Sequence, residues 1–153
     1  MQPTFYKNDV QDVSFGILVK VVLPVNLYGC DIKDEVFIGP FVEIQKNVII
    51  GSRTKIQSHS FICELVTIGS DCFVGHGVMF INDLFTNGGP ARGDKSLWKR
   101  TIVGNNVSIG SNATILPVNI CDDVVIGAGS VVTKDIIHSG VYLGNPAKLY
   151  KEL

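Results

Sequence analysis

The chain has 153 residues and a net charge of -1, and 46% of its residues are hydrophobic while 18% are charged. A chain of this length forms one domain, 1–153, which buries roughly 68 to 70% of the surface that the unfolded chain exposes. This composition excludes a disordered chain and a strongly basic nucleic-acid binder, so we expect no nucleic acid among its partners.

The first 25 residues follow no clear repeat, and we expect them to form an irregular cap on whatever fold follows. The longest apolar run, from Val13 to Val25, is interrupted by Lys20 and Pro24 and is shorter than the roughly 20 residues of a membrane-spanning helix. The run also lacks the basic start of a signal peptide. We therefore predict a soluble, cytoplasmic protein without a membrane partner.

A six-residue repeat occupies residues 26–136. Large apolar residues stand six apart nine times in succession, a period that matches neither an α-helix nor a single strand. They are Ile32, Ile38, Ile44, Ile50, Ile56, Ile62, Ile68, Val74 and Phe80. Glycine often follows the apolar residue, where we expect it to adopt backbone conformations closed to other residues. A small or β-branched residue stands four positions after the apolar one, as suits short strands. The spacing predicts a coil that winds once every few hexapeptides.

The repeat breaks after Phe80 and resumes at Val103, so 23 residues stand where six would suffice. We expect an extruded loop over 83–101, because unstructured connections longer than about 12 to 15 residues are uncommon and are often functional. Arg92 in this loop is a candidate for two-point contacts to the phosphates of a nucleotide. The alternative is a solvated loop that Trp98 anchors to a neighbouring subunit.

The repeat slips once more by one residue, between Ile115 and Ile120, before it ends at residue 136. The tail, 137–153, contains GNPAKLYKEL, which we interpret as a turn followed by a short terminal helix. The four cysteines form no CxxC pair and are expected to be reduced packing residues. They are Cys30, Cys63, Cys72 and Cys121.

Segments such as IGPFVE, IGSRTK, IGSNAT and IGAGSV resemble the hexapeptide repeat of the left-handed parallel β-helix acyltransferases. The resemblance implies an all-β fold in which three hexapeptides make one triangular coil, and a homotrimer with sites between neighbouring subunits. The segments GHGVMFINDLF, ILP, IGAGSVVTKDI and GNPAK are most similar to the nucleotide-linked amino-sugar N-acetyltransferases. Those enzymes of surface-glycan and lipopolysaccharide biosynthesis transfer acetyl from acetyl-CoA to the amine of a deoxy sugar on dTDP or UDP.

One candidate site follows from the register. If 18 residues complete a coil, Glu64 and Asn82 lie above one another at the same corner and should touch. Asn82 is also the last residue before the loop, where a side chain can turn toward a ligand, so we assign it to catalysis and Glu64 and Asp83 to substrate binding. The alternative is that Glu64 pairs with Lys46 at the surface and Asn82 merely starts a turn.

A second candidate site contains histidines. His76 lies at another corner above Ser58, with His59 one coil away, and we assign His59 to substrate binding. In hexapeptide acyltransferases with hydroxyl acceptors a histidine serves as general base, which contributes about 10²- to 10⁴-fold. An amine acceptor needs less help, so we prefer direct attack of the amine on the thioester and keep His76 as the alternative base. A turn residue bonded to a backbone carbonyl is the other interpretation of His76.

Acetyl-CoA is expected in the groove between two parallel coils, where small residues permit a close approach. The candidates by residue type are Gly110, Ala113, Ala128 and Gly129, although the coil itself also requires glycine. The resemblance adds Lys134, Asn145, Pro146 and Lys148, with the lysines facing the phosphates of CoA.

The chain is therefore predicted to be an acetyl-CoA-dependent N-acetyltransferase of a nucleotide-linked amino sugar that uses no metal. A sugar or serine O-acetyltransferase with His76 as base is the nearest alternative. The γ-class carbonic anhydrases share the fold but need three converging histidines, and His138 lies beyond the last repeat. A non-catalytic β-helix subunit is a third alternative.

Overall fold

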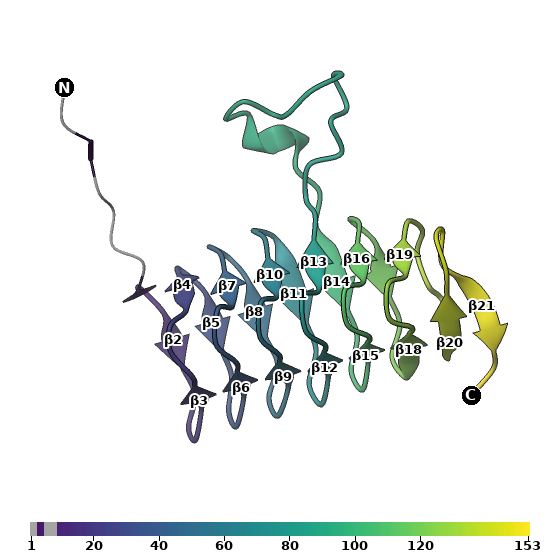
Figure 1. Ribbon diagram of the computed structural model, residues 1–153, viewed down its shortest axis with the longest axis horizontal. Helices are drawn as coiled ribbons and strands as arrows, with labels where there is room; N and C mark the ends of the chain where they lie inside the picture. Colours follow the sequence, from purple (N-terminus) through teal and green to yellow (C-terminus); the bar gives the residue numbers. More distant parts are fainter. Residues whose placement is uncertain (1–2, 5–8) are drawn as a thin grey trace.

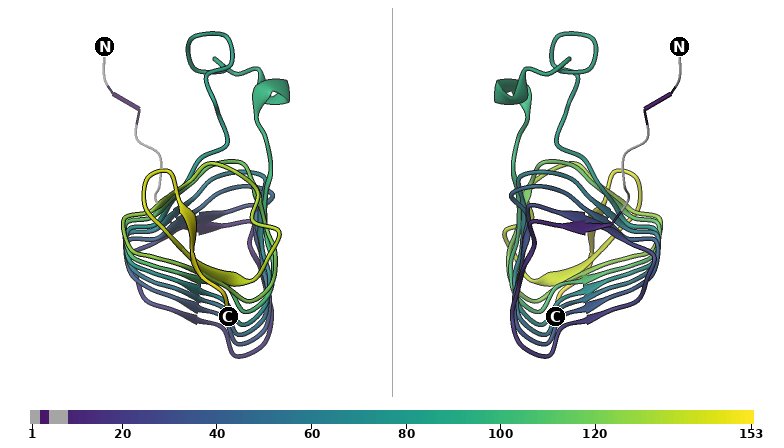
Figure 2. Two further views of the ribbon diagram at one scale, coloured as in Figure 1. Left: turned by 90° about the vertical axis from the view of Figure 1, so that its right-hand side faces the viewer. Right: turned by 90° about the vertical axis from the view of Figure 1, so that its left-hand side faces the viewer.

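The computed structural model describes residues 3–4 and 9–153, and its regular part is a left-handed parallel β-helix (Figure 1). Viewed along the axis, the coils superimpose as a triangle with three walls (Figure 2). We name the walls A, B and C, and the corners between them the A–B edge, the B–C edge and the C–A edge, in the order in which the chain passes them. The strands follow the expected fold class.

Each wall is one sheet of short strands from successive coils, and wall C also contains β21, which turns back beside β20. Wall A contains β1 (Val10–Gln11), β4 (Asn26–Tyr28), β7 (Glu43–Ile44), β10 (Phe61–Ile62), β13 (Met79–Phe80), β16 (Thr114–Ile115) and β19 (Val131–Val132). Wall B contains β2 (Ser14–Phe15), β5 (Asp31–Ile32), β8 (Ile49–Ile50), β11 (Val66–Ile68), β14 (Thr101–Val103) and β17 (Asn119–Ile120). Wall C contains β3 (Lys20–Val21), β6 (Phe37–Ile38), β9 (Lys55–Ile56), β12 (Phe73–Val74), β15 (Ser108–Ile109), β18 (Val124–Ile126), β20 (Gly140–Leu143) and β21 (Lys148–Lys151).

The register confirms the predicted coil. Ile50 in β8 pairs with Ile68 in β11, eighteen residues further along the chain. Beyond the loop the coils are one residue shorter, so Ile109 pairs with Ile126. Positions one coil apart therefore form columns along each wall and each edge, and the single-residue slip keeps the columns aligned.

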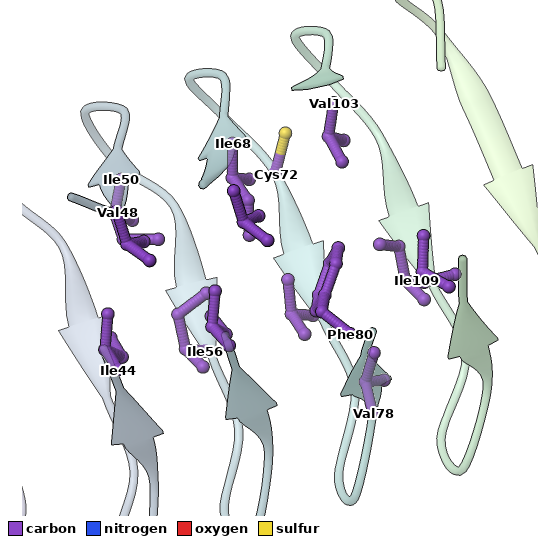
Figure 3. Close-up of a cluster of buried hydrophobic side chains, with 14 of the residues drawn as sticks. Ile44, Val48, Ile50, Ile56, Ile68, Cys72, Val78, Phe80, Val103 and Ile109 are labelled. Carbon is purple, nitrogen blue, oxygen red and sulfur yellow. The ribbon is translucent and has the colours of Figure 1, made fainter. Parts of the chain in front are cut away.

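The core fills the interior of the triangle. All nine of the six-spaced apolar residues are buried, as predicted, and so are eight of the nine residues four positions after them; Figure 3 shows part of this core. Two of those residues are polar, and their hydroxyls donate to backbone oxygens on the same edge of the next coil: Thr54 to Gly69 and Ser60 to Gly75, each at 2.8 Å. Full burial of a side chain the size of isoleucine stabilises the fold by about 1.5 to 3 kcal/mol, so these columns hold the coil together.

The glycines that follow the apolar residues are required for a reason other than the one expected. The residues with a left-handed backbone stand two positions after the glycine position, as Arg53 with φ 61° and His59 with φ 64° do. Gly51 instead allows the coils to approach each other, because a Cβ atom there would lie 2.4 Å from the backbone carbon of Gly69. The spacing between coils, and not the turn, selects glycine at this position.

The N-terminal part is more regular than the expected cap. Strands β1, β2 and β3 already pair with the next strands of walls A, B and C, so the coil begins at Val10. The edge between Leu27 and Ile32 is one residue short, which breaks the six-residue period and conceals this coil in the sequence. Residues 1–2 and 5–8 of the expected cap lie outside the described residues.

The expected C-terminal helix is wrong. Strand β20 adds to wall C beside β18, and β21 turns back to pair with β20 in antiparallel orientation. The end of wall C offers unpaired backbone groups to the tail, and a strand satisfies them where a helix would not. The hairpin of β20 and β21 thus closes this end of the coil.

Candidate functional site

The extruded loop leaves the A–B edge between β13 and β14 and stands away from the coil (Figure 1). At its root, the side-chain amide of Asn82 donates to the backbone oxygen of Glu64, with an Nδ2–O distance of 3.2 Å. The backbone oxygen of Asn82 accepts from the backbone N–H of Lys99 at 2.9 Å, which closes the loop. Asn82 and Glu64 therefore touch, as the eighteen-residue register predicts.

The carboxylate of Glu64 holds an ammonium group from the loop. Lys95 Nζ lies 2.7 Å and 2.9 Å from the two carboxylate oxygens. The same Nζ atom lies 4.9 Å from the ring centroid of Trp98, within the range of a cation–π contact. The sequence left open a surface ion pair between Glu64 and Lys46. In the structure Glu64 pairs with Lys95 instead. Sequence reasoning missed Lys95, because nothing in the repeat indicates where a loop residue will fold back.

A chain of polar contacts continues from Glu64 toward the N-terminal coils. The backbone N–H of Glu64 donates to Gln45 Oε1 at 3.3 Å, and Gln45 Nε2 donates to Glu43 Oε1 at 2.8 Å. Burial raises the pKa of the Tyr28 hydroxyl, and the negative charges of Glu43 and Glu64 raise it further. Two carboxylates thus act on the same part of the A–B edge and give it negative character.

The loop is organised by its own acidic residues. Asp83 accepts from the backbone N–H of Phe85 at 2.9 Å with one oxygen and from that of Ala91 at 2.7 Å with the other. Both oxygens of Asp83 therefore brace the loop. A short 3-10 helix, η1 (Lys95–Leu97), begins at Asp94, whose carboxylate accepts from the backbone N–H of Ser96 at 3.1 Å. Those hydrogen bonds lower the pKa of Asp94.

Arg92 is the middle residue of the 83–101 loop. Its side chain is exposed and lines a hollow of about 360 Å³ between residues 87 and 97. The guanidinium makes no ion pair within the described part of the chain. An arginine in such a position can present its planar donors to an anionic group.

The predicted histidines share the C–A edge. Ser58 Oγ and His76 Nδ1 lie 2.8 Å apart in consecutive coils. The partner of the imidazole is therefore a serine hydroxyl and not the backbone carbonyl of the alternative interpretation. The ring of His59 stacks on Phe41 with centroids 4.9 Å apart. His76 is exposed, and its Nδ1 contact leaves Nε2 as the nitrogen that can meet a ligand. Sequence reasoning placed Ser58 beneath His76 but did not name it as a partner.

The small residues proposed for acetyl-CoA continue along the same edge. A Cβ atom at Gly110 would lie 2.4 Å from the backbone nitrogen of Ala128, so the coil itself requires glycine there. Gly129 has φ +68° and open space around it. Asn145 and Pro146 extend the edge, since the next residue donates its backbone N–H to the oxygen of Val131 at 2.8 Å.

The three remaining candidates for acetyl-CoA differ in their surroundings. Ala113 lies on the C–A edge between β15 and β16, and its side chain is fully buried in the core. Lys134 follows β19 and therefore stands on the A–B edge. Lys148 begins β21 in the closing hairpin, where its side chain is exposed. The sequence pattern does not separate such inward and outward positions among small residues.

Family models match the two halves of the coil. One, described as bacterial transferase hexapeptide (six repeats), covers residues 29–64, and the other, described as hexapeptide repeat of succinyl-transferase, covers residues 100–134. The chain therefore contains the hexapeptide repeat that both family models describe. The two matches flank the extruded loop, so the family signal comes from the coil and not from the loop.

Relatives of this hexapeptide-repeat chain include acetyltransferases. Galactoside O-acetyltransferase from Escherichia coli (strain K12) is 52% identical over 52 residues, which make up 33% of this chain and 26% of that enzyme. The polySia specific acetyltransferase NeuO superposes with a TM-score of 0.62 and 27% identity over 93% of this chain and 83% of that one. Perosamine N-acetyltransferase from Caulobacter crescentus, solved with CoA and GDP-perosamine, gives a TM-score of 0.64 at 20% identity over 94% and 57%. That likeness shows the fold alone.

The curated relatives are matched over only 10% to 32% of their own length. Within the described residues, no group of three or more His, Cys, Asp or Glu side chains is arranged to hold a metal ion. The same part of the chain has no helix that is long and apolar enough to cross a membrane.

The candidate residues of this hexapeptide-repeat chain divide between two edges. Asn82 and Glu64 lie at the A–B edge under the loop, whereas His76 and the small residues lie at the C–A edge. Wall A separates the two groups within one chain (Figure 2). A single chain therefore keeps the two groups of candidate residues apart.

Proposed function

We propose that this protein is an acetyl-CoA-dependent N-acetyltransferase that acts on the amine of a deoxy sugar linked to dTDP or UDP. The observation that carries the proposal is the contact at Glu64. Beside the amide of Asn82, this carboxylate binds a primary amine nitrogen, that of Lys95, through both of its oxygens. The acetyltransferases among the relatives, and the solved complex with CoA and GDP-perosamine, support the reaction class and the kind of acceptor.

In the proposed reaction Asn82 and Glu64 orient the sugar amine toward the thioester of acetyl-CoA. The neutral nitrogen attacks the carbonyl carbon, the carbon–sulfur bond breaks, and the sulfur of CoA takes the proton that the nitrogen gives up. Holding the two reactants in attack geometry supplies much of the rate, so the reaction needs no strong base.

The division of the candidates between two edges supports a site between subunits. We propose that the protein is a homotrimer in which the A–B edge of one subunit faces the C–A edge of the next. Acetyl-CoA would lie along Gly110, Ala128, Gly129 and the turn at Asn145, and the nucleotide would lie under the loop near Arg92. We assign this activity to surface-glycan biosynthesis in the cytoplasm.

O-acetylation of a sugar is the second candidate function. One observation favours it: Ser58 Oγ lies 2.8 Å from His76 Nδ1, and when Nδ1 donates its proton to this hydroxyl, Nε2 carries the lone pair of a base toward a hydroxyl group. The galactoside enzyme among the relatives carries out O-acetylation by its name. The two functions differ in which edge supplies the essential side chain.

An acetylation assay distinguishes them. The protein is incubated with acetyl-CoA and with matched dTDP- and UDP-hexoses that carry either an amine or a hydroxyl at the same carbon, and mass spectrometry detects the acetylated product. We expect acetylation of the amine at a rate at least about 100-fold above that of the hydroxyl. Preferential acetylation of the hydroxyl would favour the second function, and the absence of both CoA binding and product would favour a non-catalytic subunit.

A further inference from the structure

The ion pair between Glu64 and Lys95 connects the loop to the coil at the proposed acceptor site. We propose that Glu64 is a binding site for a primary ammonium group, which Lys95 fills until the protonated amine of the acceptor replaces it. This inference rests on the proposed function, because it names the form in which the acceptor enters the same site. It makes Lys95 an internal competitor of the substrate.

The two partners differ sharply in their exposure to water. The side chain of Glu64 is 12% exposed, whereas that of Lys95 is 57% exposed. A lysine with this exposure regains hydration readily when it leaves, and exposed ion pairs contribute little to stability. A carboxylate largely withdrawn from water is costly to leave without a partner. Lys95 can therefore depart only when another cation takes its place.

The surroundings of Glu64 select a cation over a neutral group. Glu43 connects to Glu64 through Gln45, and no second cation contacts either carboxylate in the described residues. A hydroxyl that displaced Lys95 would leave these negative charges without compensation. The site therefore favours an ammonium-bearing acceptor over its hydroxyl counterpart.

The loop is built so that Lys95 can move while the backbone stays in place. Asp83 braces residues 85 and 91, and Lys99 keeps its backbone bond to Asn82, so neither contact depends on Lys95. The ring of Trp98, 4.9 Å from Nζ, offers the released ammonium a nearby second host. The exchange is thus a movement of one side chain.

The exchange is balanced in charge and in protons. The acceptor enters as an ammonium ion, the prevalent form of an alkyl amine near neutral pH. One nitrogen–hydrogen bond then breaks and one oxygen–hydrogen bond forms on a water molecule, which leaves the neutral amine that attacks the thioester. No electron transfer takes place.

A charge-removing variant tests the competition. Lys95→Met keeps the length of the side chain, and Lys99→Met is the matched control, because it removes a charge from the same loop at an exposed residue. Binding to CoA-loaded protein is measured for a dTDP-hexose with an amine and for its hydroxyl counterpart. We expect Lys95→Met to tighten binding of the amine five- to tenfold and to leave the hydroxyl ligand and the control unchanged. Weaker binding of both ligands to Lys95→Met would overturn the inference and make Lys95 a structural tether.

Crystals of the wild-type protein with CoA and the amino sugar provide a second test. We expect the sugar nitrogen within hydrogen-bond distance of a Glu64 oxygen and Lys95 Nζ displaced from it. If Lys95 remains on Glu64 while the amine is held elsewhere and is still acetylated, the exchange is wrong and the proposed function stands. If no amino sugar binds to or is acetylated by the wild type or either variant, the proposed function is wrong, and the inference falls with it.

Discussion

The A–B edge and the C–A edge belong to the same coil but obtain their chemistry in different ways. At the C–A edge, the contacts of His76 with Ser58 and of His59 with Phe41 each join residues one coil apart. At the A–B edge, the decisive contact joins Glu64 to Lys95, which belongs to the loop. The repeat alone therefore builds one edge, while an interruption of the repeat builds the other. A substrate that differs between relatives is best recognised at the interrupted edge, which can change without disturbing the coil.

Removing the side chain of Asn82 is expected to have the largest effect and tests which edge supplies the essential group. Asn82→Ala should lower kcat/KM for the amino sugar by about 100-fold, because the acceptor loses its orientation. His76→Ala should lower it by less than about 10-fold, since an amine needs little base catalysis. Steady-state kinetics with acetyl-CoA in excess measures both changes.

The control for this comparison is Asn119→Ala, an exposed asparagine of wall B that should retain wild-type kinetics. Circular dichroism establishes that each variant keeps its strands. A nearly inactive His76→Ala protein beside an active Asn82→Ala protein would reverse the roles of the two edges and favour O-acetylation.

The two edges also mark how far the sequence alone could lead. The series of six-spaced apolar residues from Ile32 to Phe80 predicted the coil. The register that follows from it placed Glu64 against Asn82 and Ser58 beneath His76. Periodicity is informative there because each coil repeats the surroundings of the one before. It carries no information on Lys95, whose position depends on how a loop without a repeat folds back.

The burial of small residues and the structure of the chain ends could not be predicted from the sequence, for related reasons. Ala113 and Ala128 look alike in sequence, but one faces the core and the other faces solvent. The segment GNPAKLYKEL was expected to be a turn followed by a short helix. Its residues 148–151 form a strand instead, because β20 pairs with the open end of wall C and β21 pairs with β20. Tertiary contacts decided each of these cases.

The core beneath both edges gives the next expected effect. Ile56→Ala should lower the free energy of unfolding by about 2 to 5 kcal/mol, because it opens a cavity in a column that cannot collapse easily. The neighbouring Lys55 is exposed on the outer face of wall C, and Lys55→Ala should change the same quantity by less than about 0.5 kcal/mol. Urea unfolding followed by fluorescence or circular dichroism measures both. Equal losses in the two variants would mean that the inward and outward positions of the repeat are wrongly assigned.

The B–C edge provides the smallest expected effect, because it carries an ion pair but no proposed function. Arg53 donates to both carboxylate oxygens of Asp71, one coil away, and these hydrogen bonds lower the pKa of Asp71. The pair's contribution to stability is therefore present above the unfolded pKa of 3.8 and is lost as pH falls through the lower folded pKa. Arg53→Ala should leave acetylation unchanged and lower Tm by less than about 2 °C at pH 7, a difference that disappears toward pH 2. A loss of activity in Arg53→Ala, with Tm unchanged, would show that the third edge also takes part in binding and that the chemistry is not confined to two.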